Sequence, residues 1–550
     1  MSARGTRRLQ EKSSAKGDVE EPTQSDTSEQ EQGITKTETN SSIAETFFLL
    51  HEIIFVAVIC LAQLFTHTKE AALGQVIGIT RVIGDSFGIT NPGELSWLIA
   101  GYSLTVGTFI IFSGRLGDVF GYKTMYLLGM ARFSLWNLVA GLAVYSNHVL
   151  FIFARVLQGV GPAVVLPNSL AILGSTYAPG KRKAMVFATF GATALGGTIL
   201  GAAFSGLFAL EWWPWTFWCF SIVLAAVVVI GFFAIPSQVQ SHRQQRARGF
   251  RHLVLEELDM PGTITGVAAL VLINLAWNQA PIAGWSQPYV YITLILGILI
   301  LAVFFVIEIC YATHPLIPFN TLSSNVSFTL RAITYDWGCF GIWIYYSWQF
   351  LLVLCTESLL LATAHFSPVA ISGAVAAILT GALMHRMGPP LVMLCALLAF
   401  TVGAVLIATM PVSQTYWAQT SVATLIAPFG IDMSFPAATL ILSDAMPRRH
   451  QGIAASLVST VVNYSISIAL GFAGTVDVNV NNRGLAEADV LKGYRGALYM
   501  AIGLARFGVA ICVAFLVKTK AQRKRLVMDQ GKPEAQIDYS DLAFLPVIPV

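Results

Sequence analysis

Apolar runs of about twenty residues recur along the chain and alternate with short polar segments. A bilayer core about 30 Å thick needs roughly 20 apolar residues in a helix, so each run predicts one membrane-spanning helix. The predicted spans are 46–66, 95–113, 124–145, 149–175, 184–209, 215–235, 261–279, 288–310, 328–353, 368–385, 390–410, 416–443, 452–474 and 496–517. The segment 67–94 is only moderately apolar, and we expect it to continue the first helix and then form an outer loop.

The composition agrees with this pattern of spans. The 550 residues are 55% hydrophobic and 11% charged, whereas a soluble globular chain has about 25% charged residues. Because so few charged groups cannot cover a water-facing surface, much of this surface must face lipid. The sequence therefore predicts an all-α polytopic membrane protein, and a net charge of +3 gives no indication of nucleic-acid binding.

The positive charges predict which ends of the spans face the cytoplasm. Lys and Arg gather in the loops after spans two, four, six, ten, twelve and fourteen. The loop after span thirteen is the exception, because it contains Arg483, Lys492 and Arg495 together with acidic residues. Because Lys and Arg are enriched in cytoplasmic loops, we expect both termini to be cytoplasmic. Residues 1–44 are polar and are expected to form a disordered tail, and residues 519–550 a second cytoplasmic tail.

The loop after span two carries a glycine-rich charged motif, Gly114-Arg115-Leu116-Gly117-Asp118-Val119-Phe120-Gly121-Tyr122-Lys123. We call residues 114–123 the gating turn. Its glycines allow a very tight connection between two helices. Asp118 can pair with a cation or cap the N-terminus of a neighbouring helix, where the helix dipole favours negative charge. Arg115 and Lys123 are expected to keep the turn on the cytoplasmic side.

The gating turn resembles the G-x-L-x-D-R-x-G-R-K signature of the major facilitator superfamily. Gly114, Leu116, Asp118, Gly121 and Lys123 match it, while Val119 and Tyr122 replace its two arginines. The resemblance implies that the turn gates the cytoplasmic side of a transporter.

Span four places Arg155 and Gln158 on one helix face, followed by Gly159. An arginine within an apolar span is costly and usually faces a cavity or a partner. One interpretation is an arginine near the membrane edge that holds a carbonyl or carboxylate. The other, favoured by resemblance to the second superfamily motif, R-x-x-Q-G, is a cavity arginine that couples proton movement to substrate.

Span five contains Gly197, Gly201 and Gly206. A small-x-x-x-small pattern lets helices approach closely, so simple helix packing is one interpretation. The other is a resemblance to the antiporter motif G-x-x-x-G-P-x-x-G-G, in which Ala202 replaces the proline and Ser205 a glycine.

Several further ionisable or aromatic residues lie inside or near the spans. Asp432, in span twelve, is the candidate proton site, because a carboxylate in the membrane is by default a functional candidate; a buried ion pair is the alternative. Arg331 and Asp336, five residues apart in span nine, are cavity candidates for which an ion pair, within the helix or between helices, is the favoured interpretation. The further cavity candidates are Glu70 and Trp343, for which a helix end and core packing are the respective alternatives.

The spans divide as six, two and six, an architecture of two bundles with two inserted helices. We expect an N-terminal bundle at 45–240, a basic loop with two linker helices at 241–320, and a C-terminal bundle at 321–518. This layout resembles the fourteen-spanner drug:proton antiporters of the superfamily. Four segments resemble their fungal aminotriazole-resistance and borate-efflux branch: 277–285, 429–437, 461–465 and 491–497.

The resemblance implies a proton-coupled efflux transporter, with a small-molecule substrate and protons as partners and no cofactor. A facilitator or importer, an exporter of one secondary metabolite, and a non-transporting sensor are the alternatives. We find no catalytic triad, metal cluster or nucleotide-binding loop in the sequence and expect no enzyme. The chain is expected to be monomeric in the plasma membrane, with the vacuolar membrane as the alternative.

Overall fold

The structure is a computed structural model of the 550-residue chain. It describes residues 48–70, 82–89, 92–236, 257–313, 315–317, 324–446, 451–481, 484 and 486–530. The predicted tail 1–44, most of the basic loop before span seven, and residues 531–550 lie outside the described residues.

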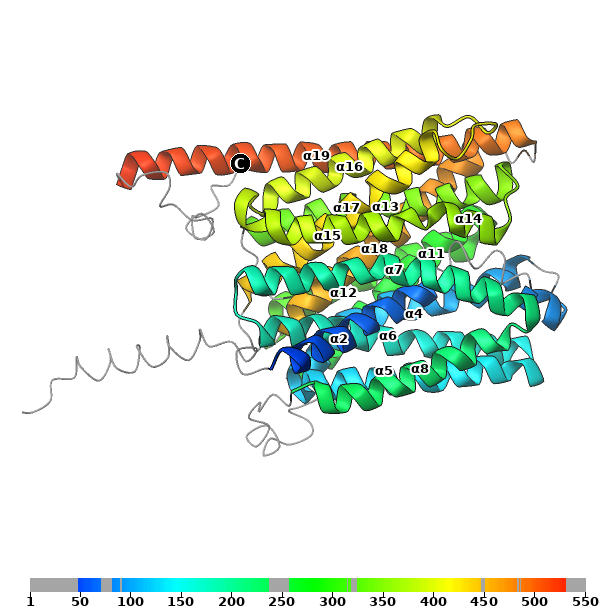
Figure 1. The fold of residues 1–550 in the computed structure, drawn as a ribbon, viewed down its shortest axis with the longest axis horizontal. Helices are drawn as coiled ribbons and strands as arrows, with labels where there is room; N and C mark the ends of the chain where they lie inside the picture. The colour runs from blue at the N-terminus through cyan, green and yellow to red at the C-terminus, as the bar shows by residue number, and fades with distance from the viewer. Residues whose placement is uncertain are drawn as a thin grey trace, which may run out of the picture. The chain divides into compact units, whose positions relative to one another are not determined.

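The described residues of the first half contain six long helices that run roughly side by side (Figure 1). They are α2 (Leu49–Glu70), α4 (Pro92–Phe120), α5 (Tyr122–Leu142), α6 (His148–Thr176), α7 (Lys181–Glu211) and α8 (Pro214–Ala234), with a 3₁₀ turn at Ala143–Tyr145. The two inserted helices follow, α11 (Met260–Ala283) and α12 (Pro288–Cys310).

The second half contains α13 (Ser324–Gln349), which continues as a π-helical turn η5 (Phe350–Leu354). It goes on with the short α14 (Leu359–Phe366), then α15 (Pro368–Met387), α16 (Pro389–Thr409), α17 (Gln419–Ala445), α18 (Gln451–Val480) and α19 (Glu487–Gln530). Thirteen segments of the described residues are long and apolar enough to cross a membrane, and α4 is a further helix of 29 residues. The all-helical prediction of about fourteen spans is confirmed.

The two halves repeat one pattern of helix contacts. In the first half, α4 packs on α6, α5 on α6 and α8, and α2 on α7. In the second half, the long helices at the same positions in the chain order make the same contacts: α15 with α17, α16 with α17 and α19, and α13 with α18. Across the halves, α4 meets α18 and α7 meets α15, a reciprocal pair that a two-fold relation between repeats produces.

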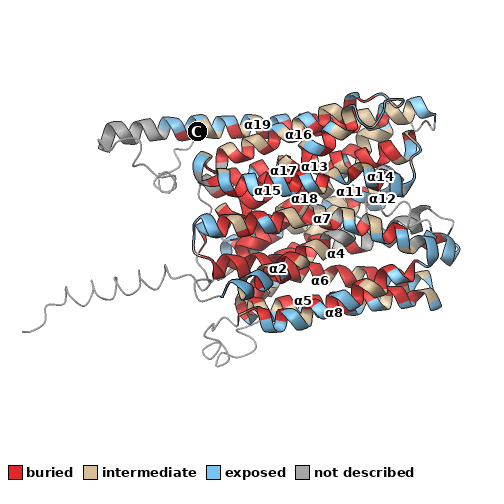
Figure 2. Ribbon diagram, in the orientation of Figure 1, coloured by how far each residue is buried: buried red, intermediate tan, exposed pale blue. Residues whose placement is uncertain are grey.

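Burial separates the central helices from those at the periphery (Figure 2). Within an apolar stretch of 18 residues in each helix, 78% of the residues are buried in α17 but only 17% in α12. Large apolar side chains such as Ile292, Ile295 and Leu299 on α12 are exposed, as expected for a helix that faces lipid. The inserted helix α11 contacts both α4 and α18, and so joins the periphery to the interface between the halves.

Three helix boundaries differ from those predicted. The gating turn is not a loop, because α4 continues to Phe120 and only Gly121 separates it from α5. A short helix, α14, lies within the predicted outer loop 354–367, and α19 runs past the predicted span end to Gln530. Hydropathy detects the membrane core, whereas a helix continues through polar residues until its backbone geometry is interrupted.

Candidate gate and transport site

Asp118, near the end of α4, joins the two halves of the fold. Its Oδ1 atom accepts a hydrogen bond of 3.0 Å from the backbone N–H of Gly452, in the first turn of α18. The same oxygen accepts a 2.7 Å hydrogen bond from the hydroxyl of Tyr122. Of the two alternatives for Asp118, the structure shows the helix N-terminus, where the unpaired N–H groups and the helix dipole favour a carboxylate. Tyr122 donates to this carboxylate at a position where the family signature has arginine.

Two glycines allow α4 and α18 to approach this closely. A Cβ atom added to Gly114 would lie 2.1 Å from the carbonyl oxygen of Gly452. A Cβ atom added to Gly452 would lie 2.3 Å from the carbonyl oxygen of Gly114 and 2.5 Å from Oδ1 of Asp118. Any side chain at either position would therefore separate the halves.

The two basic residues of the gating turn bind backbone carbonyls. The Nε atom of Arg115, which is 4% exposed, donates a 2.6 Å hydrogen bond to the carbonyl of Glu257, just before α11. The Nζ atom of Lys123 donates to the carbonyls of Phe232 and Ile235 at the end of α8, at 2.8 and 2.6 Å. Gly121 has φ 92°, a left-handed conformation that favours glycine.

A second link between the halves lies at the same end of the helices. The Nζ atom of Lys183, in the first turn of α7, lies 2.7 Å from Oδ1 of Asp444 near the end of α17. Nearby, the buried side chain of Gln451 bonds the Ser443 hydroxyl and the carbonyls of Ser443 and Met446. Together, Asp118 and the Lys183–Asp444 pair link the two halves at the end predicted to be cytoplasmic.

Within the first half, α2 is tied to the start of α7. Glu52 accepts hydrogen bonds from Arg182 and, at 2.9 Å, from the hydroxyl of Tyr177. Burial raises the pKa of the Tyr177 phenol above its usual range, and the adjacent Glu52 raises it further, so this hydroxyl remains a donor at physiological pH.

Arg155 and Gln158 come together on α6 as predicted from their spacing. Nη1 of Arg155 donates to Oε1 of Gln158 at 2.5 Å, and the guanidinium lies 4.7 Å from the ring centroid of Tyr102 on α4. Arg155 is 5% exposed and Gln158 fully buried. Gly159 allows this close packing, since a Cβ there would lie 2.1 Å from the Thr105 hydroxyl.

Asp432 is fully buried in α17, and neither carboxyl oxygen has a hydrogen-bond partner among the described residues. Pro436, four residues further on, lies on the same helix face. That face meets the other half, because the ring of Pro436 would lie 2.7 Å from a Cβ on Gly191 of α7. A carboxyl group thus lies unpaired in the membrane-spanning region, on the side of α17 that faces the first half.

The structure does not bring the other cavity candidates together. Asp336 is fully buried, next to the Ser434 hydroxyl of α17, whereas Arg331 is exposed on α13, and no ion pair joins these two described residues. The predicted pair was wrong because the side chains lie on different faces of α13. Trp343 is 1% exposed and packs against Phe366, so core packing describes it. The side chain of Glu70, at the end of α2, lies outside the described part.

Of the three glycines on α7, Gly197 marks a close helix crossing. A Cβ there would lie 2.2 Å from the carbonyl oxygen of Leu64 on α2. Gly201 and Gly206 are buried in the same helix. This crossing supports the packing interpretation of Gly197 and leaves the antiporter interpretation as a prediction.

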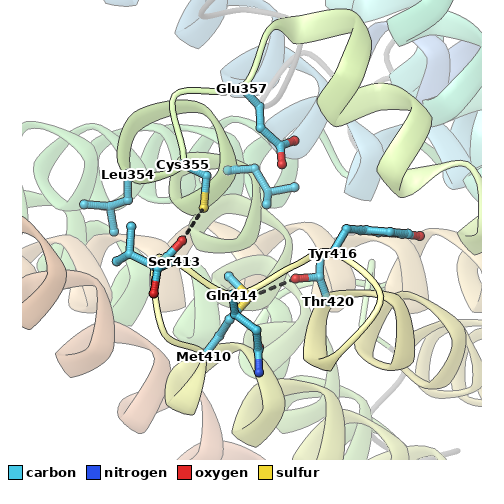
Figure 3. A pocket seen from close by; sticks show the side chains of 10 residues that line it. Leu354, Cys355, Glu357, Met410, Ser413, Gln414, Tyr416 and Thr420 are labelled. Carbon is cyan, nitrogen blue, oxygen red and sulfur yellow. Dashed lines mark hydrogen bonds between the residues drawn. The ribbon is translucent and has the colours of Figure 1, made fainter.

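A pocket of about 290 Å³ opens at the other end of the second half, between η5 and the connection from α16 to α17 (Figure 3). Its lining includes Glu357, Met410 and Tyr416. Oε2 of Glu357 lies 2.9 Å from Nδ1 of His365, and the His365 ring stacks on Tyr416 at 4.1 Å. The described residues contain no group of three or more His, Cys, Asp or Glu side chains that could hold a metal ion.

The residues that contact these candidates were not predicted from the sequence. The sequence did not indicate three further features of this region: Gly452, the pair Lys183–Asp444, and Gln451. Gly452 and the pair contact the opposite half, and Gln451 lies next to Gly452 and bonds the end of α17. The available signal was weak: a glycine directly after a polar residue at the start of span thirteen, and a lysine at the start of span five.

These features define a membrane transporter rather than an enzyme: two repeated halves of long apolar helices, carboxylate and backbone contacts that join the halves at one end, and a buried carboxyl group in α17. The sequence profile of the Major Facilitator Superfamily matches residues 59–472 and 359–533. The chain belongs to this superfamily and is a multi-pass membrane protein that transports a small molecule.

Fungal transporters are similar over most of the chain. A "Low affinity ammonium transporter" of Saccharomyces cerevisiae is 51% identical, covering 88% of this chain and 92% of the relative. "Efflux pump terJ" of Aspergillus terreus is 44% identical (84% and 88%), and the "Aminotriazole resistance protein" of Saccharomyces cerevisiae is 37% identical (86% and 85%). The predicted relation to the aminotriazole-resistance branch is confirmed.

The fold is also that of solved superfamily structures. The human organic anion transporter MFSD10 superposes with a TM-score of 0.58 at 15% sequence identity, covering 84% of this chain and 99% of that chain. At this identity the similarity shows the fold alone.

Proposed function

We propose that the chain is a proton-coupled exporter of small toxic molecules, drugs or metabolites. Substrate enters a site between the two halves from the cytoplasm, and protonation of Asp432 alternates with substrate binding. The observation that carries this proposal is the fully buried Asp432 carboxyl, unpartnered among the described residues, on the face of α17 that meets the first half. An unpaired carboxylate in a span is costly, and binding a proton removes that cost.

The contacts at the gating turn support a closed cytoplasmic gate. Asp118, Gly114 and Gly452 hold α4 against α18, and Lys183 holds α7 near α17. Opening toward the cytoplasm must break these contacts, and the cost of doing so sets how often substrate can enter. Arg155 is buried against Tyr102 within the first half. In this proposal its positive charge couples protonation at Asp432 to substrate binding.

The orientation, membrane and oligomeric state belong to the same proposal. The alternation of basic loops favours cytoplasmic termini. We propose the plasma membrane as the location, with the vacuolar membrane as the alternative, and a monomer as the working unit.

A second candidate function has its own support. The relative named a low affinity ammonium transporter is 51% identical, higher than the efflux pump terJ at 44%. A facilitator or importer of a small cation on the same fold is therefore the main alternative, and a dedicated exporter of one secondary metabolite is another.

The test is transport in cells that express the chain. Efflux of aminotriazole, borate and a cationic dye, and uptake of ammonium, are measured with and without a proton uncoupler, for the wild type and Asp432→Asn. Uncoupler-sensitive efflux that the substitution abolishes supports the exporter. Ammonium uptake, with no efflux of any panel member, rejects it in favour of the importer.

A further inference from the structure

Two buried carboxyl groups face each other where the inserted helices α11 and α12 meet. Asp259 precedes the first residue of α11, Glu308 lies near the end of α12, and each is 3% exposed. Oδ2 of Asp259 and Oε1 of Glu308 lie 2.2 and 2.7 Å from the position that a Cβ on Gly262 would occupy. The glycine thus leaves room for the two oxygens to come within hydrogen-bonding reach of each other.

The remaining oxygen of each carboxyl is already occupied. Oδ1 of Asp259 accepts a 3.2 Å hydrogen bond from the N–H of Gly262, and Oε2 of Glu308 accepts one of 3.3 Å from the N–H of Ile317. Oδ2 of Asp259 and Oε1 of Glu308 have no partner among the described residues. Within the same residues, no Lys, Arg or His forms an ion pair with either carboxyl.

The two facing carboxyl oxygens can share one proton. Two ionised carboxylates so close together repel each other, and burial strengthens the repulsion. A single proton between the facing oxygens turns that repulsion into a hydrogen bond, in which one carboxyl donates and the other accepts. No bond other than O–H is made or broken, and the proton comes from water.

The pair is connected to the gate by a very short stretch of backbone. Glu257, two residues before Asp259, accepts the hydrogen bond from Arg115 of the gating turn, and its carboxylate lies 3.9 Å from the same guanidinium. Asp259 has φ 43°, a left-handed conformation that is uncommon outside glycine and needs support from its surroundings. Among the described residues, the charged groups that face this region from the packed elements are Glu257 before α11, and Arg115 and Asp118 of α4.

We propose that Asp259 and Glu308 form a proton-binding site that stabilises the position of the gating turn. With one proton bound, the pair fixes residues 257–259 and thereby holds Glu257 against Arg115. Loss of the proton at alkaline pH separates the carboxyls, moves this segment and loosens the closed gate. This role gives the two inserted helices a regulatory function, and it rests on the proposed function only in taking the gating turn as a gate.

The test is hydrogen–deuterium exchange of the full chain in lipid nanodiscs from about pH 6 to about pH 9, the range in which buried carboxyls can titrate. The readout is exchange in peptides that cover residues 114–123 and 257–263, corrected for the intrinsic effect of pH. We expect wild-type exchange to rise several-fold with pH. Glu308→Gln, a neutral side chain that can still donate, should remove the pH dependence and stay at the low-pH level, and so should Asp259→Asn.

The matched control is Glu211→Gln, an exposed residue at the far end of α7, which should behave like the wild type. The site is overturned if wild-type exchange is flat, or if it rises equally in both neutral variants. Dependence on sodium concentration at constant pH would show a metal-cation site instead and would also overturn it. Because exchange needs no transport, a failure of proton-coupled export leaves this result standing, and a flat profile leaves export untouched.

Discussion

The carboxylate of Asp118 in the first half accepts a 3.0 Å hydrogen bond from the backbone N–H of Gly452 in the second half. These residues are 334 positions apart in the chain, and their contact lies where α4 meets the N-terminus of α18. A carboxylate at a helix N-terminus benefits from the helix dipole. The contact therefore stabilises one position of the halves relative to each other, which is what a gate requires.

Replacing Asp118 by Ala should shift the halves toward the state that is open to the cytoplasm. The loss of hydrogen bonds to a charged group costs about 1.5–3 kcal/mol, which changes the ratio of closed to open chains by roughly tenfold or more. The measurement is the distance between spin labels on Phe120→Cys and Ala445→Cys, two exposed positions at this end, in a cysteine-free background. Asp489→Ala at the opposite end is the control, and an unchanged distance distribution in Asp118→Ala would reject the gating role.

Adjacent glycines of α7 provide a matched test of helix packing. Gly197→Ala would place a Cβ 2.2 Å from the carbonyl oxygen of Leu64, whereas a Cβ on Gly196 meets nothing within 4 Å. Overpacking costs about 1–3 kcal/mol, so Gly197→Ala should lower the unfolding temperature in detergent. Gly196→Ala should leave it unchanged or raise it slightly, because alanine favours the helix. Equal unfolding temperatures for the two variants would contradict the close crossing of α2 and α7.

Lys183 and Asp444 should show energetic coupling across the halves. Lys183 is 2% exposed, but Asp444 is 37% exposed, so solvent screens part of the interaction. We expect a coupling energy of about 1 kcal/mol in a double-mutant cycle with Lys183→Met and Asp444→Asn. The cycle is measured on thermal unfolding at low and high salt. Strictly additive effects of the two substitutions would show that the pair does not contribute to the closed state.

Much of the architecture could be predicted from local patterns in the sequence. Runs of about twenty apolar residues locate the spans because bilayer thickness fixes the length of a span. The spacing of Arg155 and Gln158 predicted their contact, because residues three apart share a helix face. Helix ends were less accurate: α19 continues through the basic segment after Val517 as far as Gln530, because charged residues such as Lys and Arg are good helix formers.

Contacts between segments far apart in the chain could not be predicted from the sequence. Asp259 and Glu308 are separated by 49 positions, and Lys183 and Asp444 by 261. One sequence does not show which helix faces meet, so these charges looked like ordinary residues at the ends of spans. The predicted pair of Arg331 and Asp336 failed for the opposite reason: proximity in the chain does not place side chains five residues apart on one helix face.

We propose that transport by this chain moves protons through Asp432. The most direct measurement is proton flux across proteoliposomes when a gradient of a transported panel compound is imposed, for the wild type, Asp432→Asn and the control Asp489→Asn. We expect that substrate leaving one side drives protons the opposite way in the wild type and the control, but not in Asp432→Asn. Substrate movement without proton flux in the wild type, or undiminished proton flux in Asp432→Asn, would contradict it.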